Sequence, residues 1–184
     1  AFDGRTHKPI GSMAVGAVPA GVSVTPDGKR VLVAVRDDNR VLVLDAATLH
    51  EIARVPVGEH PFVVEVSPDG RWALALNVLS DDVSVIDMAT LAPRATLKVG
   101  RAPYGVAFSS DGARAFVTNQ QSRSVSVIDL AAINVNNRVK QAEPRLPQEV
   151  RRQGVTVEKG SSAFLQVLAF FSPDGTRDDL FTSN

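Results

Sequence analysis

The sequence contains no cysteine, which excludes disulfides and thiolate-bound metal centres among its 184 residues. It has no excess of either charge, because the formal net charge is zero, and so no basic surface argues for nucleic acid or an anionic membrane. The most apolar run, residues 163–171, is far shorter than the roughly 20 residues that a membrane-spanning helix needs. We therefore expect a globular chain with no nucleic-acid partner and no membrane span.

Catalytic motifs are also missing. The sequence has no nucleophile elbow, no glycine-rich phosphate loop and no zinc motif. His7 and His50 have no second ligand at metal spacing. The single Trp72 and the single Tyr104 are expected to pack between structural units. These absences predict a non-enzymatic protein with no catalytic residue, no metal and no cofactor.

What the sequence does have is a repeat of 42 residues. Its clearest copy covers residues 61–100, and the same phase begins at Pro19 and again at Pro103. Aspartate recurs at this spacing, as Asp3, Asp45, Asp87 and Asp129. A period near 40 residues with strand-like patterning is typical of β-propeller blades.

Each copy has the pattern of four antiparallel strands. An alternating apolar run leads into a turn of the Ser-Pro-Asp-Gly type, whose Asp-Gly pair supplies the positive φ of a tight hairpin. The second strand is continuously apolar, so we expect it to be buried on both faces. A third strand reads Val-Leu-Val-Leu-Asp in the first copy and Val-Ser-Val-Ile-Asp in the next two, and a fourth is expected at residues 52–57 and 95–99. Four-stranded units arranged radially make a β-propeller.

The repeats are too few for a closed ring. Residues 1–3 align with the third strand of an earlier blade, and the register stops near Leu130. We expect a mainly β fold: a partial β-propeller over residues 1–131, with blades starting near residues 19, 61 and 103, followed by a short α+β segment over residues 132–184. Open faces and strand edges predict association with a protein partner or neighbouring blades.

The repeat has a recognisable relative. Residues 116–119 read Phe-Val-Thr-Asn, and a Ser-Pro-Asp-Gly turn at residues 67–70 precedes the Val-Ser-Val-Ile-Asp strand at residues 83–87. On these motifs residues 1–131 resemble the YVTN-type β-propeller repeat family of extracytoplasmic and surface-layer-associated proteins. The resemblance implies the fold and a periplasmic or cell-surface location, and it implies no particular activity.

The last third of the chain resembles a different family. Residues 146–159 read LPQEVRRQGVTVEK, and with their flanks they are similar to the porter region of resistance-nodulation-division (RND) multidrug efflux pumps of the hydrophobe/amphiphile class. The resemblance covers residues 133–184 and implies a helix leading into a strand. It also implies that Phe164 matches a pocket phenylalanine that contacts drugs, so hydrophobic small molecules are expected there. Gln166 replaces the apolar residue usual in that pocket. The membrane helices and proton-relay carboxylates of that family are absent from this sequence.

Alternatives remain open for this region and for the whole chain. Residues 167–184 also resemble residues 105–120, as if a fourth blade resumed after an insertion. The join near residues 130–133 fits a gene fusion or two truncated reading frames, and both ends of the chain fall inside expected elements, which favours the second. The preferred function is a non-enzymatic binding or scaffold module. The alternatives are a piece of a drug-efflux transporter and a quinoprotein- or haem-type propeller enzyme.

Three residues are candidates for a site at the mouth of the propeller channel. Glu59, His60 and Arg101 depart from the repeat in the links that lead into a new blade. Histidine can ligate a metal or a haem, and arginine can bind a carboxylate. A solvated loop is the simpler interpretation. The repeated aspartates lie at turns, where they are expected to bond backbone amides rather than to do chemistry.

Overall fold

The computed structural model describes residues 2–133, and its strands all fall between Pro19 and Asp129. The compact unit that contains these strands ends at Leu130. The porter-like segment, Phe164 and the possible resumed blade lie outside the described residues. In the described part of the chain, no helix is long and apolar enough to cross a membrane.

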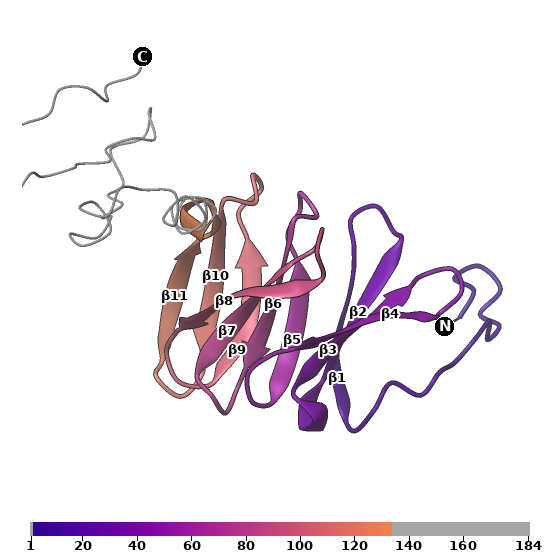
Figure 1. Ribbon diagram of the computed structural model, residues 1–184, viewed down its shortest axis with the longest axis horizontal. Helices are drawn as coiled ribbons and strands as arrows, with labels where there is room; N and C mark the ends of the chain where they lie inside the picture. The colour runs from indigo at the N-terminus through magenta and orange to yellow at the C-terminus, as the bar shows by residue number, and fades with distance from the viewer. Residues whose placement is uncertain (1, 134–184) are drawn as a thin grey trace, which may run out of the picture. The chain divides into compact units, whose positions relative to one another are not determined.

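The strands form three consecutive antiparallel sheets, which we call the first, second and third blades (Figure 1). The first blade consists of β1 (Pro19–Val24), β2 (Arg30–Val35), β3 (Arg40–Asp45) and β4 (Glu51–Pro56). The second consists of β5 (Pro61–Val66), β6 (Trp72–Asn77), β7 (Asp82–Asp87) and β8 (Ala92–Lys98). The third consists of β9 (Pro103–Phe108), β10 (Arg114–Asn119) and β11 (Ser124–Asp129). A short 3₁₀ turn, η1 (Arg36–Asp38), joins β2 to β3. The partial β-propeller predicted from the repeat is confirmed.

The hairpin turns between the first two strands of each blade follow the Asp-Gly signal. Gly28, Gly70 and Gly112 all have φ between +67° and +70°, a region that favours glycine. In the first of these turns the Thr25 hydroxyl donates to Asp27 Oδ1 over 2.6 Å. The same bond recurs 42 and 84 residues later, so the turn is part of the repeat.

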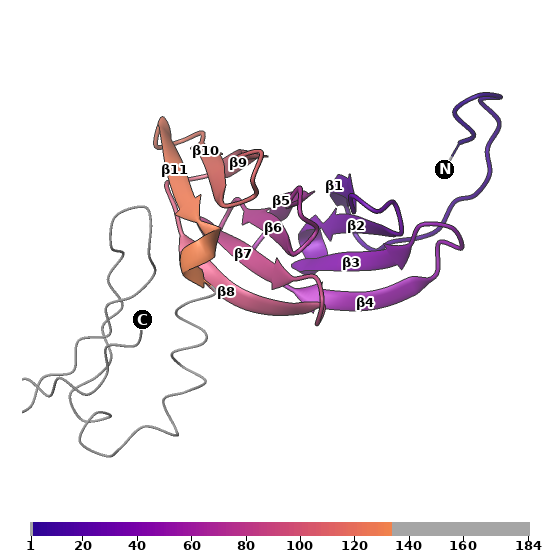
Figure 2. The ribbon, with the colours of Figure 1, turned by 90° about the horizontal axis from the view of Figure 1, so that it is seen from above.

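The first strands of the blades lie innermost and the fourth strands outermost. β1 contacts β5, and β5 contacts β9, while β4 and β8 form the far edges of their sheets. Figure 2 shows this arrangement, with β4 and β8 on the outer side of the array and β1, β5 and β9 on the inner side. The inner side is where a propeller has its channel.

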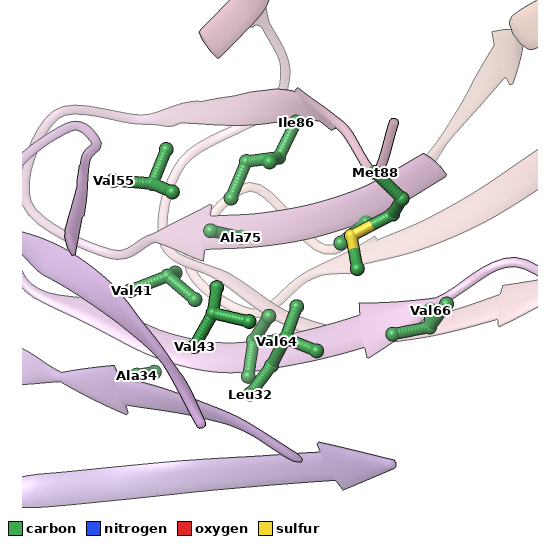
Figure 3. Close-up of a cluster of buried hydrophobic side chains, with 11 residues drawn as sticks. Leu32, Ala34, Val41, Val43, Val55, Val64, Val66, Ala75, Ile86 and Met88 are labelled. Carbon is green, nitrogen blue, oxygen red and sulfur yellow. The ribbon is translucent and has the colours of Figure 1, made fainter. Parts of the chain in front are cut away.

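Hydrophobic side chains fill the space between the first and second blades (Figure 3). The first blade contributes Leu32, Ala34, Val41, Val43 and Val55, and the second contributes Val64, Val66, Ala73, Ala75, Ile86 and Met88. Each fully buried Val, Leu or Ile stabilises the fold by about 1.5–3 kcal/mol relative to an exposed one. Packing between these two blades therefore contributes substantially to the stability of the fold.

Burial of the second strand differs between blades. All six residues of β6 are buried, as the continuous apolar pattern predicts. In β10 buried and exposed residues alternate, so the prediction of burial on both faces is wrong there. The physical reason is that, among the described residues, no further blade covers the second face of the third sheet.

The expected remnant of an earlier blade is present before β1. Phe2 forms an isolated antiparallel bridge with Pro9. Asp3 Oδ1 accepts the backbone N–H groups of Arg5 and Thr6, as Asp45 Oδ1 accepts those of Ala47 and Thr48 in the first blade. The turn between third and fourth strands is thus repeated in front of the first complete sheet.

Candidate inner-face site

The links that enter the second and third blades are held to the preceding blade by backbone hydrogen bonds, including those of Val57 and Val99 to the carbonyl oxygens of Asn39 and Asp81. The His60 N–H donates to Asn39 Oδ1 over 3.0 Å, and the Ala102 N–H donates to Asp81 Oδ1 over 2.8 Å. Asn39 and Asp81 each lie in the loop between the second and third strands of the preceding blade. These bonds fix where each link crosses from one blade to the next.

The same links carry a backbone conformation that is unusual for residues with a side chain. Val18, His60 and Ala102, at equivalent positions of the repeat, have φ values of +53°, +54° and +53°. A non-glycine residue in this region costs roughly 1–2 kcal/mol, which the surrounding hydrogen bonds must offset. His60 therefore has a defined place and direction on this loop.

A buried network of polar side chains in the second blade holds the link that contains Gly58. Asn77 Nδ2 donates to Asp82 Oδ1 over 2.8 Å and to Ser84 Oγ over 2.9 Å. Ser84 Oγ also accepts the Gly58 N–H over 3.2 Å. A side chain at Gly58 would place its Cβ 2.6 Å from Asn77 Nδ2 and 2.5 Å from Ser80 Oγ, so glycine is required. The network repeats at Asn119 and Gly100 in the third blade.

Two aromatic rings lie beside these links. Phe62 on β5 and Tyr104 on β9 are stacked, with ring centroids 4.7 Å apart and an interplanar angle of 26°. Each lies where the pairing of its strand with the next shifts register. A bulge of this kind turns a side chain away from the regular alternation. Tyr104 is partly exposed, yet its ring packs on Phe62 of the preceding blade, so the prediction that it packs between blades is confirmed, and Trp72 is buried as expected.

Sequence reasoning missed this aromatic pair. One position of the repeat is occupied by Ala20, Phe62 and Tyr104 in the three successive blades. The change from alanine to an aromatic residue in two neighbouring blades was the signal that could have found the pair. Tyr104 also borders a depression of about 440 Å³ on the third blade, whose other lining residues are Thr118, Asn119, Gln120, Arg123, Ser124 and Val125. Tyr104 thus presents aromatic surface on the innermost strand of the third blade.

The three candidate residues are not joined into one cluster. Glu59 and Arg101 occupy equivalent positions of successive links, and their N–H groups donate to Ser80 Oγ and Ser122 Oγ, each over 3.0 Å. The ion pairs found among residues 2–133 do not include one between Glu59 and Arg101. His60 Nε2 lies 3.8 Å from Asp37 Oδ1 of the first blade, a neighbour that spacing alone did not predict.

The repeated aspartates act as turn residues, as predicted. A hydrogen bond from the Thr25 hydroxyl, followed by one from the Lys29 N–H, lowers the pKa of Asp27 below its ordinary value of 3.8. The Thr48 N–H and hydroxyl lower the pKa of Asp45 in the same way. In residues 2–133 no group of three or more His, Asp or Glu side chains could together hold a metal ion.

Comparison with solved structures supports the propeller fold. Hydrazine synthase of Kuenenia stuttgartiensis is similar with a TM-score of 0.61 and 28% identity, over 68% of this chain and 37% of that one. A protein of unknown function from Desulfotomaculum acetoxidans is similar with a TM-score of 0.58 and 17% identity, over 70% of this chain and 46% of that one. The chain thus spans less than half of either structure.

Curated proteins match over a short stretch only. The multidrug export protein AcrF of Escherichia coli is 48% identical over 50 residues, which are 26% of this chain and 5% of that protein. The toluene efflux pump membrane transporter TtgB of Pseudomonas putida is 46% identical over 50 residues, with the same coverage. The predicted similarity to efflux pumps is confirmed at this level. The finer assignment to the YVTN-type repeat stays a prediction.

The family comparison corrects one expectation. The model of the cytochrome D1 heme domain matches residues 2–130. A heme domain, together with similarity to a synthase, places the propeller in an enzyme-related family, so the prediction of a non-enzymatic protein is wrong. Sequence motifs missed this because propeller enzymes carry their chemistry on loops and cofactors rather than in a local signature. Since the match covers most of the sequence, the chain belongs to the cytochrome D1 heme domain family.

Proposed function

We propose that residues 2–130 form part of the heme-binding propeller of a redox enzyme, and that the link at His60 and the Phe62–Tyr104 pair face the heme. The family's description supports a heme, and the similarity to hydrazine synthase supports an enzyme. The heme is assigned to this part of the inner side because His60 lies next to a stacked aromatic pair on the innermost strands.

The residues on the inner side have the chemical properties needed to bind a heme. An imidazole is a common axial ligand of heme iron, and His60 is partly exposed on its loop. Exposed aromatic rings offer flat apolar surface to a macrocycle, and Tyr104 provides it. Arg101 is an exposed guanidinium that can pair with a carboxylate. When bound, a heme supplies one-electron redox chemistry.

The chain's own residues would position the ligand histidine. The Asn39 side chain holds the His60 backbone, and the Asp37 carboxylate lies near Nε2. The separation of 3.8 Å between Asp37 Oδ1 and His60 Nε2 is beyond hydrogen-bond distance in this structure, and a carboxylate that moves within reach of the non-ligating nitrogen orients a ligand imidazole and raises its basicity. Asp37 is itself bonded to Arg36 Nε over 3.0 Å, which limits its movement. Asp37 is thus a positioning residue for His60.

Hemin titration tests the proposal. The full chain is expected to bind hemin with a shifted Soret band that indicates histidine ligation. His60→Ala should abolish the ligation spectrum, and Phe62→Ala should weaken binding by roughly 2- to 10-fold through the lost ring stack. His50→Ala is the matched control, because His50 lies in the turn between β3 and β4 rather than in a link between blades. An unchanged spectrum in His60→Ala would refute the assignment of the ligand.

A second candidate function concerns residues 133–184, and the 48% identity to AcrF favours it. In this proposal the segment derives from the porter region of an efflux pump and binds hydrophobic molecules through Phe164. Fluorescence titration with a hydrophobic dye would show weaker binding in Phe164→Ala than in the control Phe181→Ala. Equal dye binding by the two variants would remove this candidate.

The location of the protein is a further part of the proposal. The resemblances of both segments point to an extracytoplasmic place, the periplasm or the cell surface. Fractionation of cells that produce the protein would test this, and recovery in the cytoplasmic fraction alone would contradict it.

A further inference from the structure

Every blade has two different faces. We call the face that packs against the following blade the outgoing face and the one that packs against the preceding blade the incoming face. In the first blade the outgoing face includes Leu32, Val41 and Val43, which are buried against the second blade (Figure 3). The incoming face of the second blade includes Val64 and Val66, which are buried in the same cluster.

Among residues 2–133, no blade covers the outgoing face of the third blade. Phe116, Val125 and Val127 are 40%, 60% and 60% exposed. Their equivalents in the second blade, Leu74, Val83 and Val85, are fully buried. The outgoing faces of the first and second blades are each covered by the next blade. The third blade has the same kind of apolar face, and none of the described residues covers it.

The incoming face of the first blade is also only partly covered by the described residues. Val22 and Val24 on β1 are 65% and 53% exposed, whereas the equivalent Val64 and Val66 are buried. Deeper on this face, Val15 packs against a small cluster formed by Val33, Val35, Leu42 and Leu44. The first and third blades lie at opposite ends of the array, so the two open faces do not meet within one molecule (Figure 2).

We propose that these two faces dock head to tail between two copies of this chain. The outgoing face of the third blade in one copy covers the incoming face of the first blade in the other. The occupant follows from the repeat, because this contact would extend the packing already present between the first and second and the second and third blades. Exposed valines and a phenylalanine meet, with no charge to desolvate at these five positions. The two faces differ, so the contact is heterologous rather than two-fold symmetric.

The number of strands at the two ends of the array also fits this docking. Among the described residues the third sheet has three strands, whereas the first and second sheets have four. Residues 10–15 occupy the fourth-strand position of the repeat ahead of the first blade. There Met13 is equivalent to Val55, which is buried between blades, while Met13 is exposed. In the docked pair this segment would lie beside β11 as β4 lies beside β3, and the end of β11 would replace Phe2 in its bridge with Pro9.

Sedimentation velocity with two charged variants tests the proposal on the full chain. Wild-type protein is expected to form concentration-dependent assemblies, since each copy has both faces. Val127→Lys and Val24→Lys should each weaken assembly about 100-fold, because a buried unpaired charge costs several kcal/mol at an interface. Both positions are more than half exposed in one copy, so neither change should disturb folding.

Mixing the two variants distinguishes this docking from other modes. A mixture should restore a one-to-one complex, since each variant retains the face that the other has lost. Leu79→Lys is the control and should assemble like the wild type, because Leu79 lies in an exposed loop between β6 and β7. A monomeric wild type at the highest soluble concentration would overturn the proposal. So would a mixture that stays monomeric, or an effect of Val127→Lys without one of Val24→Lys. The hemin spectrum plays no part in these outcomes.

Discussion

The second and third blades contain the same third strand but bury it differently. Residues 83–87 and 125–129 both read Val-Ser-Val-Ile-Asp. Val83 and Val85 are inaccessible to solvent, whereas Val125 and Val127 are largely exposed. The difference cannot come from the strands themselves, so it comes from what lies next to them. In this propeller, burial and therefore stability belong to the contact between blades rather than to the blade.

The largest expected effect is at the equivalent positions Leu74 and Phe116. Leu74→Ala should lower the free energy of unfolding by about 2–5 kcal/mol, because it opens a cavity between the second and third blades. Phe116→Ala should cost about 1 kcal/mol or less, since that ring is partly exposed. Urea unfolding at low protein concentration, where association is minimal, measures both values. Equal costs would show that the outgoing face of the third blade is covered in solution.

Much of the fold was predictable, because the repeat states the same pattern more than once. The hairpin turns are at the expected Asp-Gly pairs, and β6 and β7 contain the expected apolar runs. The fourth strand was less accurate: β8 begins at Ala92, ahead of the expected residue 95. Its pairing with β7 shifts register between Val85 and Ile86, and a bulge of this kind breaks the alternation on which the prediction rested.

The candidate site was predictable only in part. His60 stood out because it departs from the repeat, and the structure places it on a link held by Asn39. Asp37 and Phe62 were not found, since their closeness to His60 and Tyr104 depends on how neighbouring blades pack. A repeat reports what each blade shares. It does not report which side chains of two adjacent blades meet.

An intermediate effect is expected from the buried amides Asn77 and Asn119. Asn77→Ala should lower the free energy of unfolding by about 1–3 kcal/mol, because the buried Asp82 carboxylate loses a donor. Asn119→Ala should cost about 1 kcal/mol, since its partners Ser124 and Ser126 are neutral hydroxyls. Thermal unfolding of both variants checks this order. A larger cost at Asn119 would mean that Lys98 and the Ser80 hydroxyl, 3.1 Å and 3.0 Å from the Asp82 carboxylate, satisfy it without Asn77.

The smallest expected difference in stability is between glycine substitutions at two loop residues that have the same backbone conformation. Asp81 and Arg123 have φ values of +54° and +52° in the loops before β7 and β11. Arg123→Gly should raise the free energy of unfolding by up to about 1 kcal/mol, since glycine adopts this conformation without the clash of a Cβ. Asp81→Gly should bring no gain, because it removes the acceptor of the Ala102 N–H and so loosens the link into the third blade. Melting temperatures measure the pair, with a rise of about 2–4 °C expected for Arg123→Gly. A rise for Asp81→Gly as well would show that the hydrogen bond between blades contributes less than the backbone strain it opposes.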